Sequence, residues 1–222
     1  MAKTAVITGV SSFVGCHLAR TFAVTGYRVV AVTSQARDAY EGVRAERLAS
    51  IPDSVTFAVC DLTDADALAA LYDAHKPDVW VQHAGYAINY ASADYDLQAS
   101  LAMNVDALEP LYKTLSGTGC GVLVTGTSME YSTSDTANTE DDVCMPDMPY
   151  GVSKLMETAE ASRLAQEYDV PTRVARIYIP VGVYDAPGKL MDFVIRQLKA
   201  GEVAELSPCT QKRDFLGVDD LC

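Results

Sequence analysis

The fold of this chain is decided near its N-terminus, by the stretch Thr4-Ala5-Val6-Ile7-Thr8-Gly9-Val10-Ser11-Ser12-Phe13-Val14-Gly15. An apolar run ends at Gly9, and from Phe13 onward the apolar residues take helical spacing. A strand that enters a helix through such a turn gathers backbone N–H groups at the positive end of the helix dipole, which suits a pyrophosphate. Gly9 permits the tight turn, and Gly15 lets the helix lie close to the strand. Because Ser12 replaces the middle glycine of the usual Gly-x-x-Gly-x-x-Gly spacing, the turn alone is equally consistent with a plain strand–helix connection.

The composition is that of an ordinary globular protein, with 222 residues, 49% of them hydrophobic and 21% charged. The net charge of −13 argues against nucleic acid or an anionic membrane surface as a partner, because phosphate contacts need clustered Lys and Arg. No apolar run approaches the roughly 20 residues that a membrane span requires, and the N-terminus lacks the pattern of a signal peptide. The six cysteines form no C-x-x-C pair, so we expect reduced thiols in a cytoplasmic protein, with no disulfide framework and no metal site.

Segments with strand and helix patterns alternate along the chain. After the first strand, strands are predicted at residues 28–33, 55–59, 78–83, 121–127 and 172–178. Helices are predicted at residues 13–23, 64–75, 95–115, 150–168 and 189–199, and residues 128–149 read as a long surface loop. This alternation predicts an α/β fold with a doubly wound parallel sheet. In such a sheet ligands bind beyond the carboxyl ends of the strands, so the residues at those ends are the candidates for function.

The strongest chemical signal is Tyr150-Gly151-Val152-Ser153-Lys154 at the start of a predicted helix. Residues four apart share one helical face, so the phenol and the ammonium can point into one site. The pKa of a free tyrosine is roughly 10, and a nearby Lys⁺ lowers it toward the working range of an acid or base. A Tyr and a Lys at this spacing also occur on many solvent-facing helices. The functional interpretation is favoured here because the pair lies downstream of a nucleotide-type turn.

Taken together, these motifs resemble the extended short-chain dehydrogenase/reductase family, in its nucleotide-sugar epimerase, dehydratase and ketoreductase group. The matching residues run from one end of the chain to the other in the family's order: Thr8-Gly9, Phe13-Val14-Gly15, Asp61-Leu62, His83-Ala84-Gly85, Asn104-Val105, Thr127-Ser128, Tyr131, Pro149-Tyr150, Lys154, Arg213-Asp214-Phe215 and Val218-Asp219-Asp220. The combination is more specific than any single motif, and it implies a Rossmann fold that binds a nicotinamide dinucleotide.

The resemblance implies three catalytic residues. Tyr150 would be the general acid/base, Lys154 would hold the nicotinamide ribose and tune Tyr150, and Thr127 would hydrogen-bond the substrate carbonyl or hydroxyl. For Thr127 the plainer interpretation is a strand-end hydroxyl with no catalytic role. His83 is expected to be structural, and Asn104 to be a polar group inside a helix.

The same resemblance implies a set of cofactor contacts. Asp61 would accept a hydrogen bond from the adenine amino group while Leu62 packs beside the ring, and a helix-capping role for Asp61 is the alternative. The remaining contacts would come from the turn, from the strand ends and from the two motif residues on the helix: Gly9, Ser11, Ser12, Phe13, Val14, Gly15, Ala84, Gly85, Tyr150 and Lys154.

The end of the second strand bears on the choice of cofactor. Family members that use NAD commonly carry an acidic residue there, whereas this chain reads Thr33-Ser34-Gln35-Ala36-Arg37. Hydroxyls and a guanidinium suit a 2′-phosphate, so NADP is favoured over NAD, with Thr33 and Arg37 as its contacts. The alternative is that Arg37 is a solvated loop cation.

The residues that follow Thr127 limit the types of reaction that the chain could catalyse. Sugar 4,6-dehydratases of this family place an acidic residue two positions later, where this chain has Met129, and Glu130 is expected to point to the opposite side. A Thr-Tyr-Lys set suffices for hydride transfer with one proton, which predicts an NADP-dependent 4-ketoreductase acting on a nucleotide-linked sugar or related keto compound. A 4-epimerase that retains NAD, and a catalytically silent dinucleotide-binding module, remain the alternatives.

The domain division follows from the same alignment of motifs. Residues 1–178 are predicted to form the dinucleotide-binding domain, and residues 179–222 a small, truncated substrate lobe, because family members continue well beyond Cys222. The chain is therefore either a fragment or an enzyme with a reduced lobe. An apolar patch on so short a lobe would be exposed, and we expect it to drive self-association, with a homodimer as the expected form.

Overall fold

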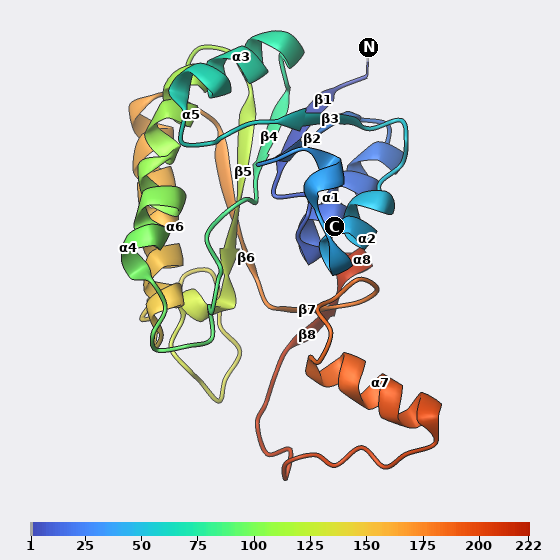
Figure 1. Cartoon of the computed structure of the whole chain (residues 1–222). Helices are drawn as coiled ribbons and strands as arrows, with labels where there is room; N and C mark the ends of the chain where they lie inside the picture. Colours follow the sequence, from blue (N-terminus) through green and yellow to red (C-terminus); the bar gives the residue numbers. More distant parts are fainter. Residues whose placement is uncertain (1) are drawn as a thin grey trace.

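The computed structural model describes residues 2–222 and shows an α/β protein built on one six-stranded sheet (Figure 1). The strand order is β3-β2-β1-β4-β5-β6, and all neighbouring strands are parallel. The strands are β1 Thr4–Thr8, β2 Arg28–Thr33, β3 Thr56–Val59, β4 Val79–Gln82, β5 Gly121–Thr127 and β6 Thr172–Ile177. This order is that of the Rossmann sheet, and its switch point lies between β1 and β4. The predicted doubly wound parallel sheet is confirmed.

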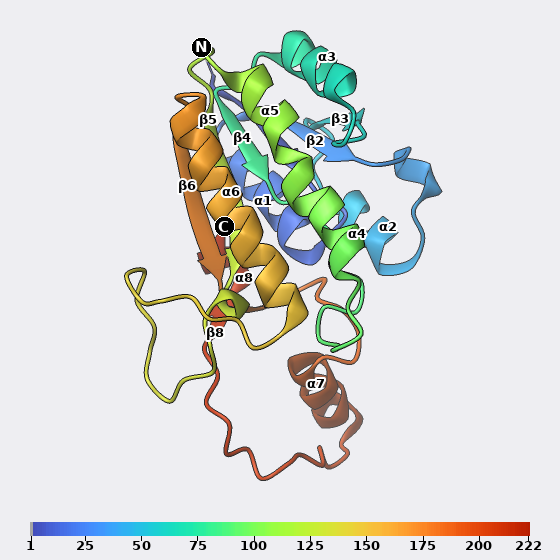
Figure 2. The same cartoon turned by 90° about the vertical axis from the view of Figure 1, so that its left-hand side faces the viewer.

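Helices cover both faces of the sheet (Figure 2). On one face lie α1 (Phe13–Val24) and α2 (Gly42–Ala49), and on the other lie α3 (Ala65–His75), α5 (Leu108–Leu115) and α6 (Pro149–Glu167). Successive residues of a strand point to opposite faces, so Val6 packs under α3, α5 and α6 while Ala5 and Ile7 pack under α1. Because β1 is buried on both faces, its sequence is a continuous apolar run instead of an alternating one.

Most predicted elements agree with the structure to within one residue at each end, and the exceptions are local. The predicted helix at residues 95–115 is wrong in its middle, where a π-helical segment (Ala102–Asp106) separates α4 (Leu97–Leu101) from α5. A π segment widens the turn, and here it carries the buried Asn104, whose Oδ1 accepts a hydrogen bond from Tyr86 N at 2.7 Å. The predicted loop at residues 128–149 begins with a 3₁₀ turn, Ser128–Glu130.

Three short helical segments and two short strands have no predicted counterpart. The helical segments are α2, a 3₁₀ turn at Arg37–Ala39 and α8 (Val218–Leu221). The strands are β7 (Ile179–Val181) and β8 (Phe215–Gly217), which pair in parallel as a separate sheet. Strands of three residues are too short to show a period, which explains why the sequence pattern does not reveal them.

The C-terminal part leaves the sheet and returns to it. Helix α7 (Leu190–Ala200) lies apart from the sheet in Figures 1 and 2, whereas α8 (Val218–Leu221) packs against α1. Val218 is only 2% exposed and belongs to the core under α1. His17 of α1 is buried and contacts Asp219 Oδ1 at 3.2 Å and the carbonyl oxygen of Val183 at 2.9 Å. Within residues 2–222 no helix has both the length and the apolar character needed to cross a membrane.

Candidate functional site

The turn between β1 and α1 depends on two glycines. Gly9 has φ of +70°, and a Cβ on it would lie 2.8 Å from Ala84 N at the end of β4. A Cβ on Gly15 would lie 2.2 Å from the carbonyl oxygen of Gly9, so the helix can approach the strand only with glycine there. The first turn of α1 is thus held against the end of the sheet, as a pyrophosphate-binding turn requires.

Ser12 caps α1 and connects the turn to β4. Its Oγ accepts a hydrogen bond from Gly15 N at 2.9 Å and lies 2.8 Å from Nε2 of His83, whose Nδ1 lies 2.9 Å from Thr125 Oγ1. Burial, with a smaller effect from the charge of Lys154, lowers the pKa of His83 from 6.5 to about 4. A neutral ring can accept from Ser12 at Nε2 and donate to Thr125 at Nδ1, so His83 joins the turn to β4 and β5. This agrees with the structural role expected from the sequence.

The ends of β1 and β4 are joined through a second hydroxyl. Thr8 Oγ1 accepts hydrogen bonds from His83 N and Ala84 N, each at 2.9 Å, and donates to the carbonyl oxygen of Val81 at 3.2 Å. A Cβ on Gly85 would lie 2.9 Å from Asn104 Oδ1, so the next residue also passes a neighbouring segment closely. The strand ends that carry the predicted contacts Gly9, Ala84 and Gly85 therefore lie together.

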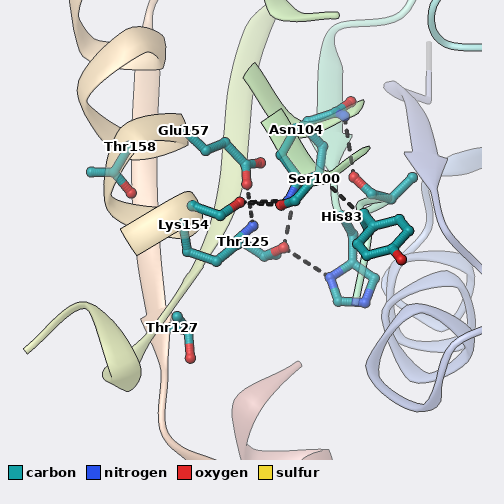
Figure 3. A network of polar contacts seen from close by, with 12 residues as sticks. His83, Ser100, Asn104, Thr125, Thr127, Lys154, Glu157 and Thr158 are labelled. Carbon is teal, nitrogen blue, oxygen red and sulfur yellow. Dashed lines mark hydrogen bonds and ion pairs between the residues drawn. The ribbon is translucent and has the colours of Figure 1, made fainter. Parts of the chain in front are cut away.

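The three predicted catalytic residues come from two adjacent elements. Thr127 is the last residue of β5, while Tyr150 and Lys154 lie on the first turns of α6. A Cβ on Gly151 would lie 2.1 Å from the carbonyl oxygen of Met129, so α6 begins directly against the 3₁₀ turn that follows Thr127. Figure 3 shows Lys154 reaching from α6 toward the network of Ser100, Asn104 and Thr125. The catalytic roles themselves stay predictions.

Tyr150 is surrounded by other aromatic rings. The ring centroids of Tyr90 and Tyr95 lie 5.5 and 5.7 Å from that of Tyr150. Burial, followed by the negative charge of Glu157, raises the pKa of Tyr150 well above its ordinary value. The expected lowering of this pKa by Lys154 is outweighed by burial, and the ammonium itself pairs with the carboxylate of Glu157.

Glu130 is a site-supporting residue that the sequence pattern did not identify as buried. Its side chain is fully buried and accepts hydrogen bonds from Thr127 N at 2.8 Å, from Arg176 Nε at 2.9 Å and from Thr158 Oγ1 at 3.0 Å. Its partners on β6 and α6 agree with the expectation that it does not take the place of the missing dehydratase acid. A glutamate beside a polar loop carries no local mark of burial, so only the tertiary structure reveals it.

The end of β2 places Arg37 beside a cavity. The Arg37 guanidinium lies 4.6 Å from the ring centroid of Phe57 and donates to the carbonyl oxygen of Leu48 at 2.9 Å. It lines a cavity of about 410 Å³ together with Asp38, Tyr40, Ala45 and Ala49. Thr33 Oγ1 donates to the carbonyl oxygen of Gln35 at 2.8 Å. Arg37 is therefore held in place by its neighbours, and it is accompanied by Asp38, which the sequence interpretation did not consider.

The end of β3 carries the predicted adenine contacts. Asp61 is exposed and accepts hydrogen bonds from Thr63 N at 2.9 Å and Thr63 Oγ1 at 2.7 Å, which lower its pKa. Asp64, not Asp61, caps α3, since its Oδ1 accepts from Asp66 N and Ala67 N. Leu62 is partly buried and packs against the core under α3.

These features together fit a dinucleotide. The helix N-terminus of α1, the glycines that a Cβ would obstruct and the strand ends at Ala84 and Asp61 line the carboxyl edge of the sheet on both sides of the switch point. Lys154 would hold a ribose by hydrogen bonds from its ammonium, at the far end from Arg37.

Comparison with known proteins agrees with this geometry. The profile of the NAD dependent epimerase/dehydratase family matches residues 5–222. Protein CapI of Staphylococcus aureus is 24% identical over 227 residues, which cover 97% of this chain and 66% of CapI. The structure also resembles the UDP-glucuronic acid 4-epimerase of Bacillus cereus in complex with UDP-glucuronic acid and NAD, with a TM-score of 0.82, 21% identity, and coverage of 98% of this chain and 70% of that one. MoeE5 in complex with UDP-glucose and NAD gives a TM-score of 0.75 at 25% identity, over 99% of this chain and 69% of that one. The chain spans about two thirds of the length of these relatives.

Proposed function

This chain belongs to the NAD dependent epimerase/dehydratase family, and from that premise we propose that it transfers a hydride at C4 of a nucleotide-linked sugar. The observation that carries the proposal is the meeting of Thr127 with the first turns of α6, which bear Tyr150 and Lys154, at the carboxyl edge of the sheet. The adjoining turn has the form that a pyrophosphate needs.

Each residue has one task in this reaction. Tyr150 gives its phenolic proton to the sugar oxygen when a keto group is reduced and takes a proton back when the alcohol is oxidised. Thr127 donates its hydroxyl hydrogen to the same oxygen and so orients the sugar. Lys154 binds the ribose. A bound nicotinamide supplies or accepts the hydride. The raised pKa of Tyr150 means that the phenol is protonated in the chain without ligand, which is the form needed to donate.

The first candidate within this class is a 4-epimerase that retains NAD. The two solved structures described above are both complexes with NAD and a UDP-sugar. Epimerisation needs only the Thr-Tyr-Lys set, and Glu130, which is bound to Arg176 and Thr158, does not add a dehydratase acid. By this interpretation Asp38, in the same cavity as Arg37, accepts a hydrogen bond from the adenosine ribose.

The second candidate is an NADP-dependent 4-ketoreductase, and a specific observation favours it. β2 ends at Thr33 without a carboxylate, and the cavity that follows is lined by the guanidinium of Arg37 as well as by Asp38. A guanidinium suits a 2′-phosphate. In that case oxidised cofactor would leave after each turnover.

One experiment separates these candidates. The dinucleotide released from the purified chain by denaturation is identified by chromatography, and the chain is then assayed with UDP-glucuronic acid and with a panel of nucleotide 4-keto sugars plus NADPH. Retained NAD with interconversion of C4 epimers supports the epimerase, and NADPH oxidation supports the ketoreductase. Dinucleotide binding without turnover of any sugar nucleotide contradicts the proposal and leaves a binding module.

Two further properties belong to the proposal. Six free cysteines, three of them buried, support a reducing compartment such as the cytoplasm. The exposed apolar residues of α7, including Leu190, Ile195 and Leu198, support self-association, with the homodimer tested by sedimentation.

A further inference from the structure

Lys154 and Glu157 form a buried ion pair one turn apart on α6. Their side chains are 8% and 1% exposed, and Lys154 Nζ donates to Glu157 Oε2. Within residues 2–222, Oε1 of Glu157 has no hydrogen-bond partner, so the ammonium is the one polar group that holds this carboxylate. Figure 3 shows both side chains extending from α6 toward the centre of the polar network.

The surroundings make a charge at Glu157 unfavourable without that partner. Burial raises its pKa, Lys154 opposes the rise, and the negative charge of Glu130 adds to it. Groups from every neighbouring element face the pair: Glu130 from the 3₁₀ turn, Tyr95 from the segment before α4, Tyr112 from α5, Tyr150 from α6 and His83 from the end of β4. Arg176 of β6, which also packs against α6, pairs with Glu130, so Lys154 is the cation bound to Glu157.

A carboxylate in this place adds little to the stability of α6. Burying two charges removes them from water, and the attraction between them in general no more than repays that penalty. An apolar residue of similar size would serve the helix as well. What the carboxylate supplies is an acceptor and a counter-charge at Lys154, the residue on which the proposed ribose contact depends.

We propose that Glu157 is the positioning residue of Lys154: it keeps the ammonium charged and directs it into the dinucleotide site. This inference rests on the proposed function, because it assigns a role toward the cofactor of that same site. The carboxylate takes one of the three ammonium protons and leaves two for ribose hydroxyls. When the carboxylate is replaced by a neutral group, the buried ammonium lacks a counter-charge and loses its proton more readily.

The variant Glu157→Gln tests the role, because the amide oxygen can still accept a hydrogen bond but carries no charge. NADH and NADPH are titrated against the unaltered chain and the variant from pH 6 to pH 10, with cofactor fluorescence as the readout. We expect Glu157→Gln to weaken binding of the preferred dinucleotide about tenfold at pH 7. We also expect its affinity to fall with rising pH at least about one pH unit earlier than in the unaltered chain.

The matched control is Glu160→Gln, which removes a carboxylate one turn further along α6, where it pairs with Arg163 at the surface. It should leave both affinity and pH dependence unchanged. A folded Glu157→Gln variant with unaltered affinity and pH dependence would overturn the role of Glu157. If the unaltered chain binds neither dinucleotide, the proposed function itself fails and this inference falls with it, so the two failures are distinguishable.

A double variant covers the case in which Glu157→Gln does not fold. Lys154→Met with Glu157→Met removes both charges and leaves no lone ion in the interior, so it should fold. A residue that acts only through Lys154 has no effect once Lys154 is gone. We therefore expect the double variant to bind NADH and NADPH as weakly as Lys154→Met alone, with the same pH dependence. A further loss in the double variant would show that Glu157 acts independently of Lys154 and would overturn the inference.

Discussion

Ser12 Oγ and His83 Nε2 lie 2.8 Å apart, and this contact joins the first turn of α1 to the end of β4 across the switch point of the sheet. Ser12, which replaces the middle glycine of the family's spacing, is thus the residue that contacts His83. Because Ser12 also accepts from Gly15 N, its own proton is available for the ring nitrogen.

The neutral state of His83 predicts how stability depends on pH. Its pKa is lowered from 6.5 to about 4 in the folded chain, so between these values the unfolded chain binds a proton that the folded chain does not. The free energy of unfolding should therefore fall as the pH drops through this window, by up to about 3 kcal/mol, and this contribution is fully present above it. Urea unfolding of the unaltered chain and of His83→Asn from pH 4 to pH 7 measures the effect. The variant should lose most of this slope and the control His75→Asn should retain it, whereas equal slopes in all three chains would refute the assignment.

Tyr150→Phe should remove turnover and leave dinucleotide binding nearly unchanged, because the ring stays and only the phenolic group is deleted. Loss of one positioned acid/base lowers the rate about 10²–10⁴-fold. The control is Tyr27→Phe, just before β2 and far along the chain from the motif. Wild-type turnover by Tyr150→Phe on any accepted sugar nucleotide would mean that the acid/base is another group.

Cofactor preference should respond to the end of β2. Arg37→Glu combined with Thr33→Asp places one carboxylate at the cavity beside Phe57 and a second at the end of β2. There they repel a 2′-phosphate and can accept a hydrogen bond from a ribose 2′-hydroxyl. We expect the ratio of the NADPH and NADH dissociation constants to rise about tenfold or more, which corresponds to about 1.4 kcal/mol. Arg44→Glu makes a similar charge change on the exposed side of α2 and should leave the ratio as it is. An unchanged ratio in the double variant would reject the role of Arg37.

Glu130→Gln should destabilise the chain and displace Thr127. The carboxylate is fully buried and opposes Arg176, so removal of its charge leaves the guanidinium without a counter-ion, which costs about 3 kcal/mol or more. Urea unfolding gives the change in the free energy of unfolding. Glu109→Gln, which breaks an exposed pair with Lys113, should have a much smaller effect. Equal midpoints for the two variants would contradict a structural role for the buried carboxylate.

The sequence predicts those parts of the molecule whose structure is determined by residues close together in the chain. Strands such as β2 are continuous apolar runs, helices such as α1 have apolar residues at helical spacing, and the Tyr150–Lys154 pair is marked by its spacing. All three are therefore visible without tertiary structure. The parallel, doubly wound sheet then follows from the alternation of the elements.

What the sequence does not predict depends on contacts between distant segments. The burial of Glu130 requires Arg176, which lies 46 positions away, and the raised pKa of Tyr150 depends first on its burial beside the rings of Tyr90 and Tyr95. The π segment around Asn104 likewise depends on Tyr86 and on Ser153 of α6. Hydrophobic periodicity indicates which face of a helix or strand is buried. It does not indicate which polar side chains from different elements will form contacts there.

The packing of α8 against α1 has a consequence for how this chain can be rearranged. Because β7 and β8 pair side by side and Val218 is anchored in the core, residues 182–214 leave and re-enter the molecule at neighbouring points. These residues form a long connection whose two ends lie close together. The entropic cost of closing such a connection grows slowly with its length, by about 0.6 kcal/mol for each doubling of a flexible loop. The connection can therefore be exchanged as a unit. A chimaera that keeps β7, β8 and α8 and replaces residues 182–214 leaves every residue proposed to touch the dinucleotide in place.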